Sequence, residues 1–167
     1  MENHKDPIEI LMKEHDEGIK YLARLDNAAD SIRQNGFSAE AFEQIAEAIR
    51  FVDVDIRQHN EKEEKYLFPL MDRHVNGPAK VMRSEHRELW RVFSELRKSV
   101  KDVEEGRIHG TSIKELLQSS KLLVELLSQH IAKENEVLFP MAKQVLSSEE
   151  YEQLKEEINN ATVTQAK

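Results

Sequence analysis

Two histidine–glutamate pairs occupy positions where the helical period calls for apolar side chains. QHNEKEEKYLFPLM (residues 58–71) contains His59 and Glu63, and QHIAKENEVLFPMA (residues 129–142) contains His130 and Glu134. Residues four apart in a helix lie about 40° apart around its axis, so each histidine faces the same way as its glutamate. Burying a carboxylate without compensation costs several kcal/mol, against a total stability of about 5–15 kcal/mol. The sequence therefore predicts positive charge between the two carboxylates.

The same residues belong to an internal repeat. A step of 71 residues relates His59 to His130, Glu63 to Glu134 and Leu-Phe-Pro at 67–69 to Leu-Phe-Pro at 138–140. The same step relates His15 to His86. Shared helical phasing alone would match apolar positions, but it would not match His, Glu and Pro. The pattern predicts two copies of one helical hairpin.

The elements that position these residues are predicted to be helices, because apolar residues recur every three or four positions. The first begins after Asp6 and ends at Asn35-Gly36, and the second runs from near Ser38 to the turn at 76–78. The third ends near Gly106, the fourth is capped by Thr111 or Ser112, and a short fifth follows Ser147 with Glu150 completing its cap. Pro69 and Pro140 should bend or loosen their helices. The same phasing predicts that Ile113 and Leu117 face the core, together with either Gly18 or Ile19 and either Leu123 or Val124.

The predicted fold class is all-α, an antiparallel up-down-up-down four-helix bundle with a short C-terminal fifth helix. We expect residues 1–167 to form a single domain, with the bundle at about 6–145, the short helix at about 148–159 and a frayed tail at 160–167.

Helix lengths bring six polar side chains to one level. His15 and His86 lie about eight or nine residues from the starts of their helices, and Glu63 and Glu134 roughly ten before the ends of theirs. With His59 and His130, they provide four imidazoles and two carboxylates, too many for one ion but suited to two bridged first-row metals. Iron, manganese, zinc and copper accept this mixture, whereas magnesium and calcium prefer oxygen alone. The alternative is a metal-free network of protonated histidines and carboxylates.

Composition and net charge exclude several classes of partner and of functional site. A net charge of -8 argues against nucleic acid as a partner. The absence of cysteine excludes disulfides, thiol catalysis and zinc-finger sites within this sequence. No apolar run is long enough for a membrane span and the N-terminus lacks the apolar stretch of a signal peptide, so we expect no membrane partner and a cytoplasmic location.

The order His, His-x-x-x-Glu, His, His-x-x-x-Glu, with Leu-Phe-Pro behind each pair, resembles the hemerythrin-like (HHE cation-binding) family over about residues 6–145. The resemblance implies an antiparallel four-helix bundle around a non-haem di-iron centre. Its cofactor would be two iron ions joined by an oxo or hydroxo bridge. The ligands carried over are His15 and His59 for one iron, His86 and His130 for the other, and Glu63 and Glu134 as bridges.

The sequence departs from the oxygen-carrying hemerythrins at Trp90, where those proteins have a further histidine. Without it each iron has five ligands, so both irons would have an open position. That arrangement suits reaction with peroxide or nitric oxide better than reversible oxygen storage. Glu14 and Glu85 lie about 100° from the ligands next to them and are expected only as outer partners, whereas Glu61 and Glu64 should point away from His59.

The expected function is to bind or react with O2 or a related small oxidant, as a binding, sensing or storage protein. The alternative is a di-iron enzyme that breaks down peroxide or reduces nitric oxide. A role in repairing iron centres ranks lower, because repair proteins of this family often carry an N-terminal cysteine-bearing segment that this sequence lacks. A ferritin-like oxidase would need the order Glu-x-x-His, whereas here the histidine comes first with a four-residue step. A histidine phosphotransfer bundle would need one exposed histidine, whereas these four are predicted to face inward.

The expected partner is a small diatomic or peroxide ligand, and any protein partner is unknown. Outside the predicted site, we expect His74 to lie at the end of the bundle and His4 and His109 to be inert.

Overall fold

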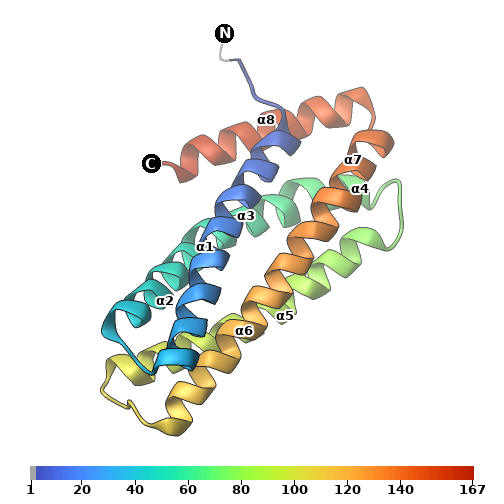
Figure 1. The fold of residues 1–167 in the computed structure, drawn as a ribbon. Helices are drawn as coiled ribbons and strands as arrows, with labels where there is room; N and C mark the ends of the chain where they lie inside the picture. Colours follow the sequence, from blue (N-terminus) through green and yellow to red (C-terminus); the bar gives the residue numbers. More distant parts are fainter. Residues whose placement is uncertain (1–2) are drawn as a thin grey trace.

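The structure is a computed structural model that describes residues 3–167, and its regular elements in that range are all helices. Two pairs of long helices run antiparallel, and a last helix crosses one end of the bundle (Figure 1). This arrangement confirms the predicted fold class. The helices are α1 (Pro7–Asn35); α2 (Ala39–Phe51), η1 (Val52–Ile56), α3 (Arg57–Lys62), η2 (Glu63–Leu67) and α4 (Phe68–Met71), which together form the second long helix; α5 (Pro78–Glu104); α6 (Gly110–Lys133), η3 (Glu134–Leu138) and α7 (Phe139–Val145), which form the fourth; and α8 (Ser148–Gln165).

Most helix ends follow from local sequence. Asp6 accepts a hydrogen bond from the Glu9 N–H at 3.0 Å and Ser38 accepts one from the Ala41 N–H at 3.1 Å, so each caps a helix as predicted. Gly36 has φ 85°, a left-handed conformation that glycine adopts without strain, and it ends α1.

The predicted cap of the fourth helix is wrong. The cap is His109, whose Nδ1 accepts a hydrogen bond from the Ser112 N–H at 3.4 Å, while the Ser112 hydroxyl accepts one from the His109 N–H at 3.1 Å. The imidazole nitrogen takes the place of the usual Ser or Asp oxygen. Ser112 is therefore the third helical residue, and His109, which was expected to be inert, has a structural role.

The last helix is longer than predicted. Ser147 and Glu150 form the expected capping box, but α8 continues to Gln165 and includes most of the predicted tail. Contacts with the bundle hold this extension: Asn159 exchanges hydrogen bonds with the Lys5 backbone, and Thr162 accepts one from Lys62 at 3.1 Å. Tertiary packing stabilises a helix that its own sequence would leave marginal.

Both prolines that follow the Leu-Phe pairs are accommodated by a π turn. The Phe68 N–H bonds the Glu63 carbonyl, and the Phe139 N–H bonds the Glu134 carbonyl, each five residues back. Proline lacks an N–H and its ring crowds the carbonyl four residues before it, and the wider turn absorbs that conflict. The predicted loosening of these helices is confirmed, and each π turn begins at a glutamate of the polar layer.

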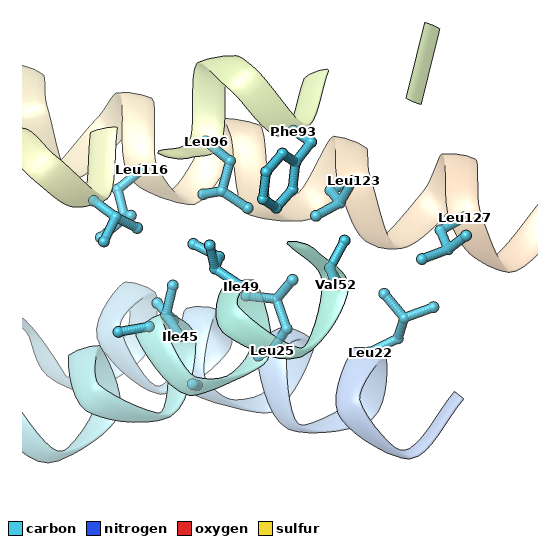
Figure 2. Packing of buried hydrophobic residues seen from close by; sticks show 14 of the residues in the cluster. Leu22, Leu25, Ile45, Ile49, Val52, Phe93, Leu96, Leu116, Leu123 and Leu127 are labelled. Atoms are coloured by element: carbon cyan, nitrogen blue, oxygen red, sulfur yellow. The ribbon is translucent and has the colours of Figure 1, made fainter. Parts of the chain in front are cut away.

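The interior consists of two apolar clusters separated along the bundle. The larger, shown in Figure 2, joins residues of α1, α2, η1, α5 and α6, among them Leu25, Ile49, Phe93 and Leu123. The smaller lies at the end crossed by α8 and includes Leu11, Phe68, Phe139 and Leu154. Along every long helix, the polar residues identified above fall between the two clusters.

Individual core positions refine the helical phasing. Gly18 is buried and Ile19 is 47% exposed, and a side chain at position 18 would lie 3.1 Å from Ile56 Cδ1. In the first two turns of α6 the buried apolar residue is Leu116, and the predicted Ile113 and Leu117 are only partly buried. The start of this helix is thus rotated slightly from its predicted orientation.

Across residues 3–167, no helix combines the length and apolar composition required to cross a bilayer.

Candidate metal centre

The six side chains predicted as ligands meet in one buried layer between the apolar clusters. Each long helix contributes at least one of them, and the π turns η2 and η3 each contribute a glutamate as their first residue. None is more than 4% exposed. They are His15 of α1, His59 of α3, Glu63 of η2, His86 of α5, His130 of α6 and Glu134 of η3.

The potential ligand atoms form two groups that share both carboxylates. One group comprises His15 and His59 with Glu63 and Glu134, the other His86 and His130 with the same glutamates, and the ligand atoms of each lie within 4.8 Å of one another. Among residues 3–167, no further His, Asp or Glu joins either group. The position that Trp90 leaves open is therefore not filled by a side chain of these types.

Distances within the groups fit ligands arranged around ions. Glu134 lies 3.0 Å from His15 Nε2 and 3.1 Å from His130 Nε2, and Glu63 lies 3.2 Å from His59 Nε2. The Nε2 atoms of His86 and His130 are 3.0 Å apart. Two ligands at about 2.1 Å from one ion and about 90° apart lie about 3 Å from each other.

Hydrogen bonding within the layer is incomplete without an ion. The Nε2 atoms of His15 and His59 and both oxygens of Glu63 and of Glu134 are buried with no aligned hydrogen-bond partner. Buried polar atoms are rarely left unpaired, because each costs free energy. These atoms converge on shared points, which is the arrangement that cations between them would require.

An outer ring of polar side chains orients the four imidazoles. Each Nδ1 lies within hydrogen-bond distance of a side-chain oxygen on another helix, which directs Nε2 inward. The pairs are His15 with Asn135 at 2.7 Å, His59 with Glu14 at 3.2 Å, His86 with Glu64 at 2.7 Å and His130 with Glu85 at 2.8 Å.

Glu14 and Glu85 are the outer partners that the sequence predicts, whereas Glu64 and Asn135 were missed. Glu64 does point away from His59, as expected, but this direction leads to His86 on α5. Asn135 reaches His15 on α1 in the same way. The 71-residue step relates Glu64 to Asn135 and was the signal that could have identified the pair.

Trp90 belongs to neither group of ligand atoms, and its ring packs against neighbouring side chains. Its ring lies 5.3 Å from that of Phe93, nearly perpendicular, and the Arg57 guanidinium lies 4.1 Å from its centroid. His74 lies at the bundle end, where its Nε2 is 2.6 Å from Glu150 in the first turn of α8. His4 is exposed near the start of the chain.

Without a metal the layer holds protons. Burial and the neighbouring charge of Glu134 raise the pKa of Glu63 to about 8. Burial opposes charge on His130, but its contacts with Glu134 raise its pKa to about 9. Burial likewise works against the Glu134 carboxylate, yet the imidazoles of His130 and His15 close to it keep its pKa well below the ordinary value. Burial and the nearby His130 lower the pKa of His86.

We expect metal binding to release protons and to strengthen as pH rises. At pH 7 Glu63 and His130 are protonated in the metal-free centre, because both pKa values lie above 7. A ligand must lose its proton before it binds an ion, so apparent affinity should fall about tenfold per pH unit for each displaced proton as pH drops below about 8. Anaerobic calorimetric titration with Fe2+ between pH 6 and 9, in two buffers of different ionisation enthalpy, measures both effects. An affinity independent of pH would contradict them.

Comparison with known proteins agrees with this geometry. The family described as "Hemerythrin HHE cation binding domain" matches residues 6–142. The chain is also similar to the iron-sulfur cluster repair protein YtfE of Salmonella typhimurium, with 34% identity over 92 residues, covering 53% of this chain and 42% of that protein. The proteins of the same name from Salmonella paratyphi B and Salmonella newport are 33% identical over the same length, with the same shares covered. The match thus covers less than half of the length of these relatives.

Proposed function

The chain belongs to the hemerythrin HHE cation-binding domain family, and we propose that it holds two iron ions that react with a small oxidant or with nitric oxide. One observation carries this proposal: two groups of ligand atoms share two buried carboxylates whose four oxygens lack hydrogen-bond partners. Two separate cation sites would not need to share ligands, whereas a bridged pair does.

The proposed ligands are those grouped by the structure. His15 and His59 would hold one iron and His86 and His130 the other, with Glu63 and Glu134 as bridges and an oxo or hydroxo group as a third bridge. Imidazole and carboxylate ligands suit iron. When bound, iron supplies electron exchange and open coordination positions for small ligands.

The chain's own residues restrict what can react there. Apolar clusters lie on both sides of the ligands along the bundle, and the ligands are almost fully buried, so bulky substrates are excluded. The outer hydrogen bonds hold each buried imidazole so that its Nε2 atom points inward, and the ligand set is therefore organised before metal binding. O2, nitric oxide and peroxide are small enough to meet this restriction.

The ligand count favours reaction over simple carriage. No seventh His, Asp or Glu among residues 3–167 joins the groups, so each ion would have two imidazoles, two carboxylate oxygens and the bridge. Both ions would then keep a position for an incoming ligand. We therefore place breakdown of peroxide or reduction of nitric oxide ahead of reversible O2 binding.

The similarity to Salmonella proteins named for iron-sulfur cluster repair favours a second candidate, the supply of iron to damaged clusters. The named relatives support it, and the centre proposed here would provide the iron.

Anaerobic loading with Fe2+, followed by separate exposure to O2, peroxide and nitric oxide, tests these roles. We expect about two irons per chain, with rapid loss of peroxide or nitric oxide and a visible absorbance change. The variant with His59→Ala and His130→Ala is the control for reaction by free iron. A reversible O2 band without turnover would favour a binding protein, and restoration of a damaged cluster in an added iron-sulfur protein would favour repair. A chain that binds no iron would contradict all three roles.

A further inference from the structure

Lys62 and Lys133 are related by the 71-residue step, but their environments differ. Lys62 Nζ lies 2.6 Å from Glu14, and Lys133 pairs in the same way with Glu85. Lys62 is 1% exposed, whereas Lys133 is 51% exposed. Because these glutamates accept from the Nδ1–H groups of His59 and His130, two residues, a glutamate and a histidine, connect each lysine to the proposed metal position of its half.

The C-terminal helix causes this difference. The Thr162 hydroxyl of α8 donates to the Ile158 carbonyl at 2.7 Å, which leaves its oxygen to accept from Lys62 Nζ at 3.1 Å. The helix crosses one end of the bundle (Figure 1) and contacts α1, α3 and η2, so it lies against the two helices that carry His15 and His59. Lys133, on the surface of α6, lacks a comparable cover.

A second difference lies in the partners of the other two histidines. The Nδ1 atom of His86 is paired with Glu64, a carboxylate that is 45% exposed. Its counterpart His15 is paired with the amide of Asn135, which is only partly buried but carries no charge. In the His86–His130 half, the carboxylate of Glu64 and the Lys133–Glu85 ion pair, both accessible to solvent, therefore support the two imidazoles.

Release of an ion requires its imidazoles to turn away, and they turn only when their outer hydrogen bonds break. Water and salt compete with exposed ion pairs and weaken them. The Lys62 ammonium is buried, so water does not replace Glu14 as its partner, and breaking this pair leaves a charge without a partner. Glu14 and Glu85 are similarly exposed, at 28% and 25%, so the buried lysine is what holds Glu14, and with it His59, more firmly.

We propose that the two metal positions are unequal in exchange: the His15–His59 position retains its ion, and the His86–His130 position exchanges it. Lys62 and Thr162 act as positioning residues for the retained ion. This inference rests on the proposed two-ion centre and extends it, since it assigns gain and loss of metal to one half.

Release of Co2+ to excess EDTA tests the inference in the full chain loaded with about two Co2+, followed by visible absorbance. We expect two phases of equal amplitude, separated about tenfold or more in rate. Lys62→Met should accelerate the slow phase alone by about tenfold, the lower end of the 10–100-fold loss that follows removal of a direct partner of a metal ligand, because Lys62 acts on His59 through Glu14. The matched variant Lys133→Met should change either phase by less than about threefold, and Glu64→Gln should alter only the fast phase.

Thr162→Val provides a milder variant should Lys62→Met fail to fold. It removes the hydroxyl that holds Lys62, so the slow phase should accelerate several-fold, and Thr162→Ser should restore it while both variants keep the melting temperature. A single release phase, or equal effects of the Lys62 and Lys133 variants, would overturn the inference while leaving the two-ion centre intact. Failure to bind about two Co2+ per chain would overturn the proposed function and the inference with it.

Discussion

Replacing His59 and His130 together with alanine is expected to lower bound iron from about two ions per chain to nearly none. The two histidines belong to different halves of the centre, so each ion would lose one of its two imidazoles. The alanines would also leave the outer partners Glu14 and Glu85 without the N–H groups that they now accept. Elemental analysis after anaerobic loading with Fe2+ measures the loss, and circular dichroism checks that the bundle remains helical.

The matched control for this variant replaces two histidines outside the centre, His4 and His74, with alanine. His4 is exposed and the His74 imidazole pairs with Glu150 at the start of α8, so iron content should remain at about two per chain. If the His59–His130 variant kept both its iron content and its melting temperature, these histidines would not be ligands.

The second large effect concerns stability, and it has opposite signs with and without metal. Replacing Glu63 and Glu134 together with methionine is expected to raise the melting temperature of the metal-free protein by about 5–10 °C at pH 10, above the pKa of about 9 at which His130 loses its proton. At that pH both fully buried carboxylates are charged beside a neutral His130, and replacing uncompensated buried charges with apolar side chains of similar size is stabilising. The same variant should lose the metal-dependent rise in melting temperature, which in the unmodified protein should exceed about 10 °C.

The repeat provides the control for this experiment. Glu17 and Glu88 are also related by the 71-residue step, but they lie on the surface, 55% and 50% exposed. Their replacement by methionine should shift melting by less than about 2 °C, with or without metal. A metal-free Glu63–Glu134 variant that melted below the unmodified protein would mean that these carboxylates stabilise the bundle by themselves.

The sequence by itself determined the bundle and the six residues that meet at its centre. Two local properties position these residues within their helices. The helical period places His59 and Glu63 on the same side of one helix, and the number of residues from the start of α1 sets how far along the bundle His15 lies. Antiparallel packing then brings positions at equal depth together, with little freedom left. The 71-residue step added that the two halves supply equivalent side chains.

The tertiary structure alone decided what surrounds those six residues. Glu64 faces away from the ligands of its own helix and meets His86 because α5 lies on that side, which the phase of one helix does not reveal. Lys62 and Lys133 have the same local spacing, yet only Lys62 is buried, because α8 folds back over one half of the repeat. Side-chain direction follows from the period of one helix, whereas burial and partners depend on how neighbouring helices are rotated and where the chain returns.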